Sequence, residues 1–181
     1  QWSSSAASDV YKRQILDKTT FDTWNYIASH DDLIIFYGSN TFGAAQHYLD
    51  VGSKEGRAMD NFDEWLYMAS NEDLINAFGS DVNKGVQHYV QAGYWENRLK
   101  DSFDGLLYIA SHNDLINAFG TDVNKGVQHY VQAGYWEGRQ KKGFDGLSYL
   151  ASNTELISAL NGDANKACLL YTSDAADDDH C

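Results

Sequence analysis

Hydrophobic residues in this chain recur at intervals of three and four within short segments, and the whole pattern repeats every 41 residues. Each unit begins with a Phe-Asp pair, at Phe21, Phe62, Phe103 and Phe144. Intervals of three and four are typical of amphipathic helices, and a fixed period of this size indicates an array of small structural units. The sequence therefore predicts tandem repeats with three short helices in each unit.

The first two helices of each unit have recognisable starts. In the third unit an apolar stripe follows Asp104, whose carboxylate can cap the free amides of a first turn. The second helix should end before Gly120, which is placed to be the left-handed residue after a helix. This second helix is expected to begin at a capping box, which occurs at Ser29–Asp32, Ser70–Asp73, Ser111–Asp114 and Ser152–Glu155.

The third helix has small or apolar residues on two faces. Val123 and Val127 lie on one side and Gly126 on the other, and the helix should end at Gly134. A glycine inside a helix costs roughly 1 kcal/mol relative to alanine, so its presence suggests that another backbone approaches closely. Because the first unit has Ala44 at this place, one methyl group should be tolerated. We expect this helix to lie between its own repeat and the next.

A period of 41 residues also fits a β-propeller blade, but the apolar intervals are three and four rather than two, and the chain has no proline. We therefore predict an all-α fold, either an α-solenoid or a compact helical array. Helices this short depend on their neighbours for stability. The expected boundaries are a lead-in at 15–20, full repeats at 21–61, 62–102 and 103–143, and a truncated fourth repeat at 144–167.

Both ends of the chain resemble the translation of a common transposase sequencing adapter. Residues 4–14 read SSAASDVYKRQ and residues 168–178 read CLLYTSDAADD, which match the two strands of one DNA sequence. We therefore expect residues 1–14 and 168–181 to be artefacts that lie outside the repeat fold. Both cysteines, Cys168 and Cys181, fall there, so neither a disulfide nor a thiolate metal site is predicted.

Charge narrows the range of partners. The chain has 26 acidic and 13 basic residues and a formal net charge of −13. It has no basic stripe, so nucleic acid is disfavoured because its phosphates would be repelled. No apolar run approaches the roughly 20 residues that span a bilayer, so membrane insertion is not expected. The partners that remain are neighbouring repeats or domains of the same protein, another protein, or a glycan.

A histidine recurs in a Gln-His-Tyr triplet, at His47, His88 and His129. A metal site needs several converging ligands, so we interpret these histidines as half-buried side chains that bond to a backbone carbonyl or a carboxylate.

The segments that begin at Asp81 and Asp122 are similar to the start of an EF-hand loop. Their glycine is fifth rather than sixth and the twelfth residue is alanine, so calcium binding is not predicted. No cofactor is expected.

Each full unit closes with a Glu-x-Arg triplet. Its arginine precedes the capping aspartate of the next unit by six residues, which suggests the pairs Arg57–Asp63, Arg98–Asp104 and Arg139–Asp145. We interpret these pairs as clamps between consecutive repeats, since a guanidinium can bridge a carboxylate with two bonds. The alternative is a row of arginines that binds a ligand.

Two units also carry a Tyr-Trp pair before this triplet, at Tyr94-Trp95 and Tyr135-Trp136. Large aromatic side chains are expected to pack inside. If these rings are exposed instead, aromatic groups spaced by one repeat would form a ligand platform suited to a sugar polymer or a peptide.

No nucleophile with a partnered base and no glycine-rich phosphate loop is present, so an enzyme is not predicted.

The pattern FDxxxYIASxxDLIxAFG, followed by HYxxxGxxEGR, resembles repeats of large secreted bacterial proteins, including some with RTX-type calcium-binding segments or hydrolase domains. The resemblance covers residues 21–166 and implies an accessory module of an exported or cell-surface protein. The glycine- and aspartate-rich RTX nonapeptide is absent, so calcium binding is not implied.

Together these features predict a non-enzymatic module for protein interaction or spacing. The alternative is a carbohydrate- or peptide-binding accessory region of an exported hydrolase. Solvent exposure of Trp95 and Trp136 would favour the alternative.

Overall fold

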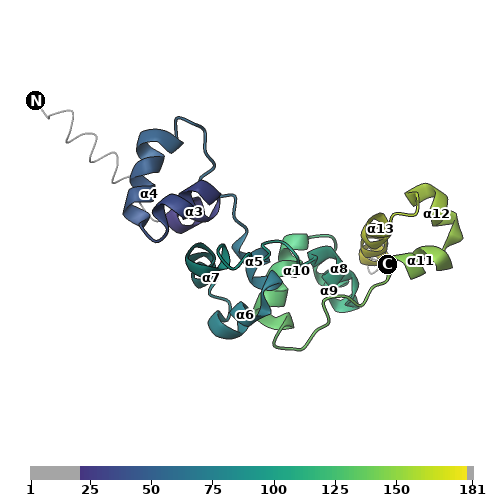
Figure 1. Ribbon diagram of the computed structural model, residues 1–181. Helices are drawn as coiled ribbons and strands as arrows, with labels where there is room; N and C mark the ends of the chain where they lie inside the picture. Colours follow the sequence, from purple (N-terminus) through teal and green to yellow (C-terminus); the bar gives the residue numbers. More distant parts are fainter. Residues whose placement is uncertain (1–20, 179–181) are drawn as a thin grey trace, which may run out of the picture. The chain divides into compact units, whose positions relative to one another are not determined.

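A computed structural model describes residues 21–178, and this part of the chain is helical with no strand (Figure 1). The prediction of an all-α fold is confirmed. The segments 1–14 and 15–20, predicted to be adapter-derived and lead-in sequence, lie outside the described residues.

All α-helices but the last are six or seven residues long: α2 (Thr23–Ala28), α3 (Asp31–Tyr37), α4 (Thr41–His47), α5 (Glu64–Ser70), α6 (Glu72–Phe78), α7 (Val82–His88), α8 (Gly105–Ala110), α9 (Asn113–Phe119), α10 (Val123–His129), α11 (Gly146–Ser152), α12 (Thr154–Leu160) and α13 (Ala164–Asp178). A π-helical turn continues the third helix of each full repeat: η1 (Tyr48–Gly52), η2 (Tyr89–Gly93) and η3 (Tyr130–Gly134).

The first helices begin as the sequence predicted. The carboxylate of Asp104 accepts the backbone amide of Leu107 at 2.9 Å, and Asp145 accepts those of Leu147 and Ser148 in the same way. These bonds satisfy amides that have no partner inside the helix. The recurrent Phe-Asp therefore marks a true helix start.

The predicted capping boxes are wrong, because the serine does not cap the second helix. Helix α9 has His112 at its N-cap position, with no side-chain cap. Ser111 instead donates its hydroxyl to the carbonyl of Leu107 and accepts the backbone amides of Gly143 and Phe144. Ser70 likewise accepts two amides from the start of the third repeat, those of Ser102 and Phe103. The serine closes one helix and holds the beginning of the following repeat.

Gly120 follows the second helix with a positive φ as predicted, but it does not adopt the left-handed helical conformation. Gly120 has φ 54° and ψ −120°, a combination that side chains with a Cβ avoid. In the fourth repeat Asn161 takes this position in the ordinary left-handed conformation, with φ 53° and ψ 36°. Asparagine tolerates that region better than other residues, which explains how the repeat can lose its glycine there.

The described chain divides into two compact units that do not coincide with the repeats. One contains residues 21–64 and 81–98, and the other contains 65–80 and 99–178. The division falls inside the second repeat because α7 and η2 pack on α2, the first helix of the preceding repeat. Tyr26 and Ile27 of α2, with Val86 and Val90 from the second repeat, are fully or almost fully buried in the first unit.

In the second unit α8 and α10 cross closely, as Gly126 predicted. A Cβ added at Gly126 would lie 2.9 Å from the carbonyl oxygen of Gly105 and 2.8 Å from the side chain of Ile109. A Cβ at Gly105 would in turn lie 2.9 Å from the carbonyl oxygen of Val123. The expected tolerance of one methyl group therefore does not hold here, because backbone blocks it on both sides.

The fourth repeat differs from expectation, since a third helix is present. Helix α13 packs against α11 of its own repeat and against α8 and α9 of the preceding one. The third helix is thus sandwiched as predicted, but with the preceding repeat rather than the next. Cys168 and Thr172 are buried, and Tyr171 stacks on Phe144 with ring centroids 4.6 Å apart. The expectation that the segment after residue 167 lies outside the repeat fold is therefore wrong for residues 168–178, which form most of α13. Their packing does not bear on their origin, so the adapter assignment stays a prediction.

Candidate functional site

The recurrent histidine is half-buried, and its partner is a tyrosine of the first helix. Tyr108 is fully buried, and its hydroxyl oxygen lies 3.0 Å from Nδ1 of His129. Tyr26 and His47 form the same pair at 3.0 Å in the first repeat. The predicted carbonyl or carboxylate partner is therefore wrong for these two histidines, because the Tyr side chain reaches across from the first helix to the third.

This pair is built for packing rather than for proton transfer. Burial raises the pKa of Tyr108 to about 12, and burial, reinforced by Arg139, lowers the pKa of His129 below its ordinary value. Both shifts favour neutral side chains at neutral pH. The tyrosine hydroxyl also fills the space that a Cβ would need at Gly134, which explains why glycine ends the π-helical turn.

The arginine at the end of each unit pairs within its own repeat. Nη1 of Arg139 lies 2.8 Å from Asp114 at the start of α9, and its Nε bonds to Glu137. Arg57 holds Asp32 and Glu55 in the same way. The predicted clamps from Arg57 to Asp63 and from Arg139 to Asp145 are therefore wrong.

The acidic partner of this arginine belongs to the predicted capping box, which gives the recurrent acid a different role from helix capping. Burial of Asp114 disfavours its ionisation, but the hydrogen bond and charge of Arg139 outweigh burial, so the pKa of Asp114 is lowered. In the first and third repeats the arginine therefore fixes the end of the repeat onto its own second helix.

No group of three metal-binding side chains is found among the described residues, and no described helix is long and apolar enough to cross a membrane.

The two Tyr-Trp pairs lie at the surface. Trp95 is 58% exposed and Trp136 is 57% exposed, whereas the preceding tyrosines are half-buried. Each indole stands perpendicular to its tyrosine, with ring centroids 5.2 Å apart in the second repeat and 5.1 Å in the third. The expectation that these tryptophans pack inside is wrong, because the pair follows the π-helical turn and only its tyrosine faces the core.

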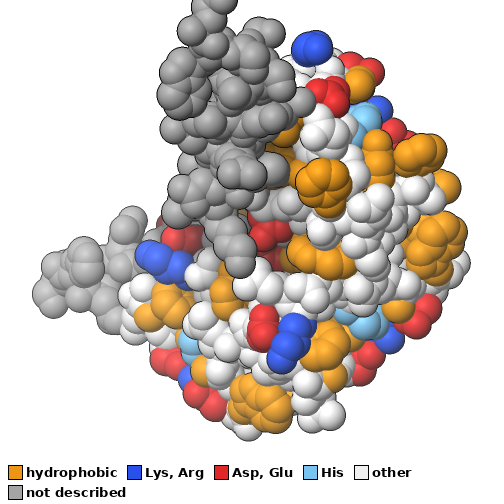
Figure 2. Space-filling model, turned by 90° about the vertical axis from the view of Figure 1, so that its left-hand side faces the viewer, with side chains coloured by type: hydrophobic (Ala, Val, Ile, Leu, Met, Phe, Trp, Pro, Cys, Tyr) orange, Lys and Arg blue, Asp and Glu red, His pale blue; other side chains and the backbone are white. Residues whose placement is uncertain are grey.

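Other hydrophobic side chains are also exposed. On the face drawn in Figure 2, hydrophobic groups are separated by acidic, basic and histidine side chains. Contacts with a partner on such a face would be made by separate hydrophobic side chains surrounded by polar groups.

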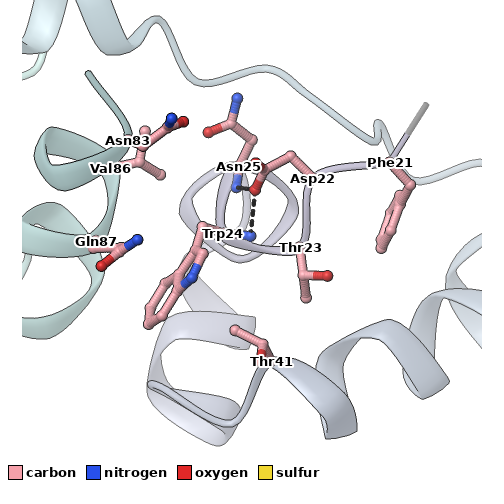
Figure 3. Close-up of a pocket in the computed structure, with 9 residues that line it drawn as sticks. All are labelled: Phe21, Asp22, Thr23, Trp24, Asn25, Thr41, Asn83, Val86 and Gln87. Carbon is pink, nitrogen blue, oxygen red and sulfur yellow. Dashed lines mark hydrogen bonds between the residues drawn. The ribbon is translucent and has the colours of Figure 1, made fainter. Parts of the chain in front are cut away.

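A cavity of about 630 Å³ lies in the first unit between α2, the start of α4 and α7. Figure 3 shows the indole of Trp24 next to the amide of Gln87 and the side chain of Thr41, with Asn83 on the same side as Gln87. Asp22 caps α2 at the edge of the cavity, where its Oδ1 accepts the amides of Trp24 and Asn25. The cavity therefore combines one large aromatic surface with several polar groups.

No sequence motif indicates this cavity. Its walls come from two consecutive repeats, from α2 and α7, whose lining residues are about 60 positions apart in the chain, and none of the predicted site residues lines it. The only available signal was divergence between repeats, since Trp24 and Asn25 correspond to Leu106 and Leu107 in the third unit.

The corresponding groove between α8 and α13 is more apolar. It has a volume of about 350 Å³, and Leu106, Leu107, Leu147 and Cys168 line it together with Asp104, Asp145 and Asn165. The positions of Trp24 and Asn25 are thus taken by leucines in the second unit, while polar groups remain at the edge of the groove.

Comparisons with protein-family models, curated proteins and solved structures found no significant match to this chain.

Proposed function

We propose that this chain is a non-enzymatic helical-repeat module that binds a glycan polymer through its exposed Tyr-Trp pairs, as an accessory region of an exported or cell-surface protein. The observation that carries the proposal is the exposure of Trp95 and Trp136, each more than half open to solvent. Exposure of a tryptophan side chain to water is unfavourable, because indole is one of the largest apolar groups in a protein, and binding of a ligand would cover it. This exposure favours glycan or peptide binding over a purely structural spacer.

The charges next to the tryptophans favour a neutral ligand. Glu96 bonds to Arg98, and Glu137 bonds to Arg139, so the carboxylates beside both indoles are already engaged inside the protein. The flat apolar face of an indole can stack on the C–H face of a sugar ring, and the tyrosine braces it at a right angle. The net charge of −13 disfavours acidic polysaccharides.

Affinity electrophoresis tests this function. The chain should migrate more slowly in gels that contain at least one of hydroxyethylcellulose, xylan, glucomannan and mixed-linkage β-glucan. Trp95→Ala and Trp136→Ala should each lower the affinity for the polysaccharide about tenfold. That factor corresponds to about 1.4 kcal/mol, and burial of an indole side chain against the ligand contributes more than this. Both variants should keep the helical circular dichroism spectrum, because the indoles are exposed.

The first repeat supplies the matched control. Lys54 stands where the other full repeats have tryptophan, so Lys54→Ala should leave retardation unchanged. The proposal is overturned if no gel retards the chain, or if both tryptophan variants bind like the parent protein.

A second candidate is protein interaction or spacing, supported by the serine hydroxyls that tie the start of each following repeat to the preceding first helix. An acidic module of this kind would attract basic peptides, and that attraction would weaken steeply with added salt. The affinity for a neutral glycan should instead be nearly independent of salt concentration between about 50 and 500 mM, a range over which charge interactions become screened.

A further inference from the structure

We propose that the cavity between α2 and α7 binds one or two units of a neutral saccharide, with Trp24 as the stacking surface and Asn83 and Gln87 as hydrogen-bonding groups. This site is distinct from the Tyr-Trp pairs and would stand even if those pairs bound another kind of polymer. It would recognise the sugar, whereas the exposed pairs supply contacts along the polymer.

The size of the cavity fits a small ligand. Its volume of about 630 Å³ lies within the roughly 300–1,000 Å³ that is usual for small-molecule sites. Figure 3 shows Trp24 reaching between Gln87 and Thr41, so a ring that stacks on the indole would lie within reach of both polar side chains. The walls come from α2, α4 and α7 of a single compact unit.

The polar groups have unused hydrogen-bonding capacity. No hydrogen bond to the side-chain amide of Asn83 or Gln87 is found among the described residues. An amide offers two donor hydrogens and an accepting oxygen, and can therefore bond to two neighbouring hydroxyls at once. Asn25 is held in place because its Nδ2 donates to Asp60 at 3.3 Å, which leaves its oxygen to accept a further bond.

Charge defines the class of sugar. The described lining contains the carboxylate of Asp22 and no lysine or arginine. Sugar phosphates and uronic acids would meet a negative charge with no basic partner, which is unfavourable in a partly enclosed site. A purely apolar ligand would leave the amides of Asn83 and Gln87 without partners. A neutral sugar, with an apolar face and a rim of hydroxyls, satisfies both kinds of surface.

The corresponding groove of the second unit argues that this polarity is not needed for packing. There Leu106 replaces Trp24 and Leu107 replaces Asn25 in the lining of the groove. Leu169 stands at the sequence position of Gln87, but it does not line this groove. The helices pack with leucine in place of both Trp24 and Asn25. The polar and aromatic lining of the first cavity is therefore available for a ligand.

The test uses the full chain and saturation-transfer NMR with glucose, mannose, galactose, N-acetylglucosamine and their β-1,4-linked disaccharides, followed by calorimetric titration of the best binder. We expect at least one disaccharide to bind. Trp24→Leu and Gln87→Leu, which introduce the residues of the second unit, should weaken that binding tenfold or more while the melting temperature stays within a few degrees. Asn165→Ala, at the position of Asn83 in the apolar groove, is the matched control and should bind normally.

The outcomes separate this proposal from the one above. If Trp136→Ala lowers polysaccharide retardation and leaves disaccharide affinity unchanged, both surfaces act as proposed. If disaccharides bind equally well to the parent chain and to Trp24→Leu and Gln87→Leu, the cavity is not the site, although the Tyr-Trp pairs could still bind glycans. If none of the saccharides binds the parent chain, the cavity proposal is overturned whatever the gels show.

Discussion

At the scale of single residues, the repeat motif is explained by contacts between the first and third helices. The hydroxyl of Tyr108 meets His129 and lies directly over Gly134, so three recurrent residues serve one contact. Glycine is needed because the hydroxyl occupies the position of a Cβ, and histidine because its ring nitrogen completes the bond. The repeated spacing of these residues within each unit is therefore a packing requirement.

The histidine makes the stability of the fold sensitive to pH. Because burial lowers the pKa of His129 below its unfolded value near 6.5, the unfolded chain binds more protons than the folded chain as the pH falls through about 6.5. The free energy of unfolding should therefore decrease on acidification from about pH 7 to 5. Urea titrations across this range should give a shallower decrease for His129→Gln. An identical slope in the variant would show that this histidine is not protected in the fold.

At the scale of elements, short helices are held by contacts at their ends and at one close crossing. The arginine after the π-helical turn is attached to the second helix, and the serine after the first helix is attached to the following repeat. The first and third repeats are thus closed by their own arginine, and each full repeat is connected to the next by its serine.

The arginine contact should be weak and specific. Arg139 is 23% exposed but Asp114 is 60% exposed, so solvent screens the pair. A double-mutant cycle of Arg139→Ala with Asp114→Ala should give a coupling energy of about 0.2–1 kcal/mol. The same cycle with Asp145→Ala should give a value near zero. A coupling energy between Arg139 and Asp145, with none between Arg139 and Asp114, would instead support the predicted clamp between consecutive repeats.

The close crossing of α8 and α10 should be the most sensitive contact of the third repeat. Gly126→Leu should destabilise the chain by roughly 1–3 kcal/mol or more, because the added side chain meets the backbone of Gly105. Lys125→Leu, one residue earlier on the exposed face of the same helix, is the control and should change the free energy of unfolding by less than about 0.5 kcal/mol. Equal effects of the two leucines in urea unfolding would mean that the helices are not in close contact.

At the scale of the whole chain, each compact unit combines helices from different repeats. The third helix of one repeat covers the first helix of the repeat before it, as α7 covers α2 and α13 covers α8. An individual repeat is therefore an incomplete folding unit, as expected for tandem arrays.

The carboxyl-terminal segment offers a test of this arrangement. Removal of residues 168–181 should increase amide exchange in α11, α12 and α8, because Cys168, Tyr171 and Thr172 would no longer cover them. Leu150 would lose part of its burial, and each fully exposed large aliphatic side chain forgoes about 1.5–3 kcal/mol. Unchanged exchange after the deletion would show that this segment does not pack on the repeats.

The sequence by itself determined the period, the all-α class and the positions of most helix ends. These features depend on interactions within one or two helical turns, such as the bonds from Asp104 and Asp145 to nearby amides. Recurrence in every copy marks such local features, although it did not reveal the role of the serine in the predicted capping boxes. The π-helical turns were missed because they add no residue type that an α-helix would exclude.

The tertiary structure decided the features that depend on how helices cross. One such feature is the partner of Arg139, which bonds to Asp114 rather than to Asp145. Another is the role of Ser111, which holds the following repeat and does not cap a helix. Both depend on distances between segments that are 25 to 33 residues apart in the chain. The exposure of Trp136 follows from the direction in which the chain leaves the π-helical turn. The cavity beside Trp24 exists only because the second repeat supplies one of its walls, and a periodic pattern carries no information about the space between two helices.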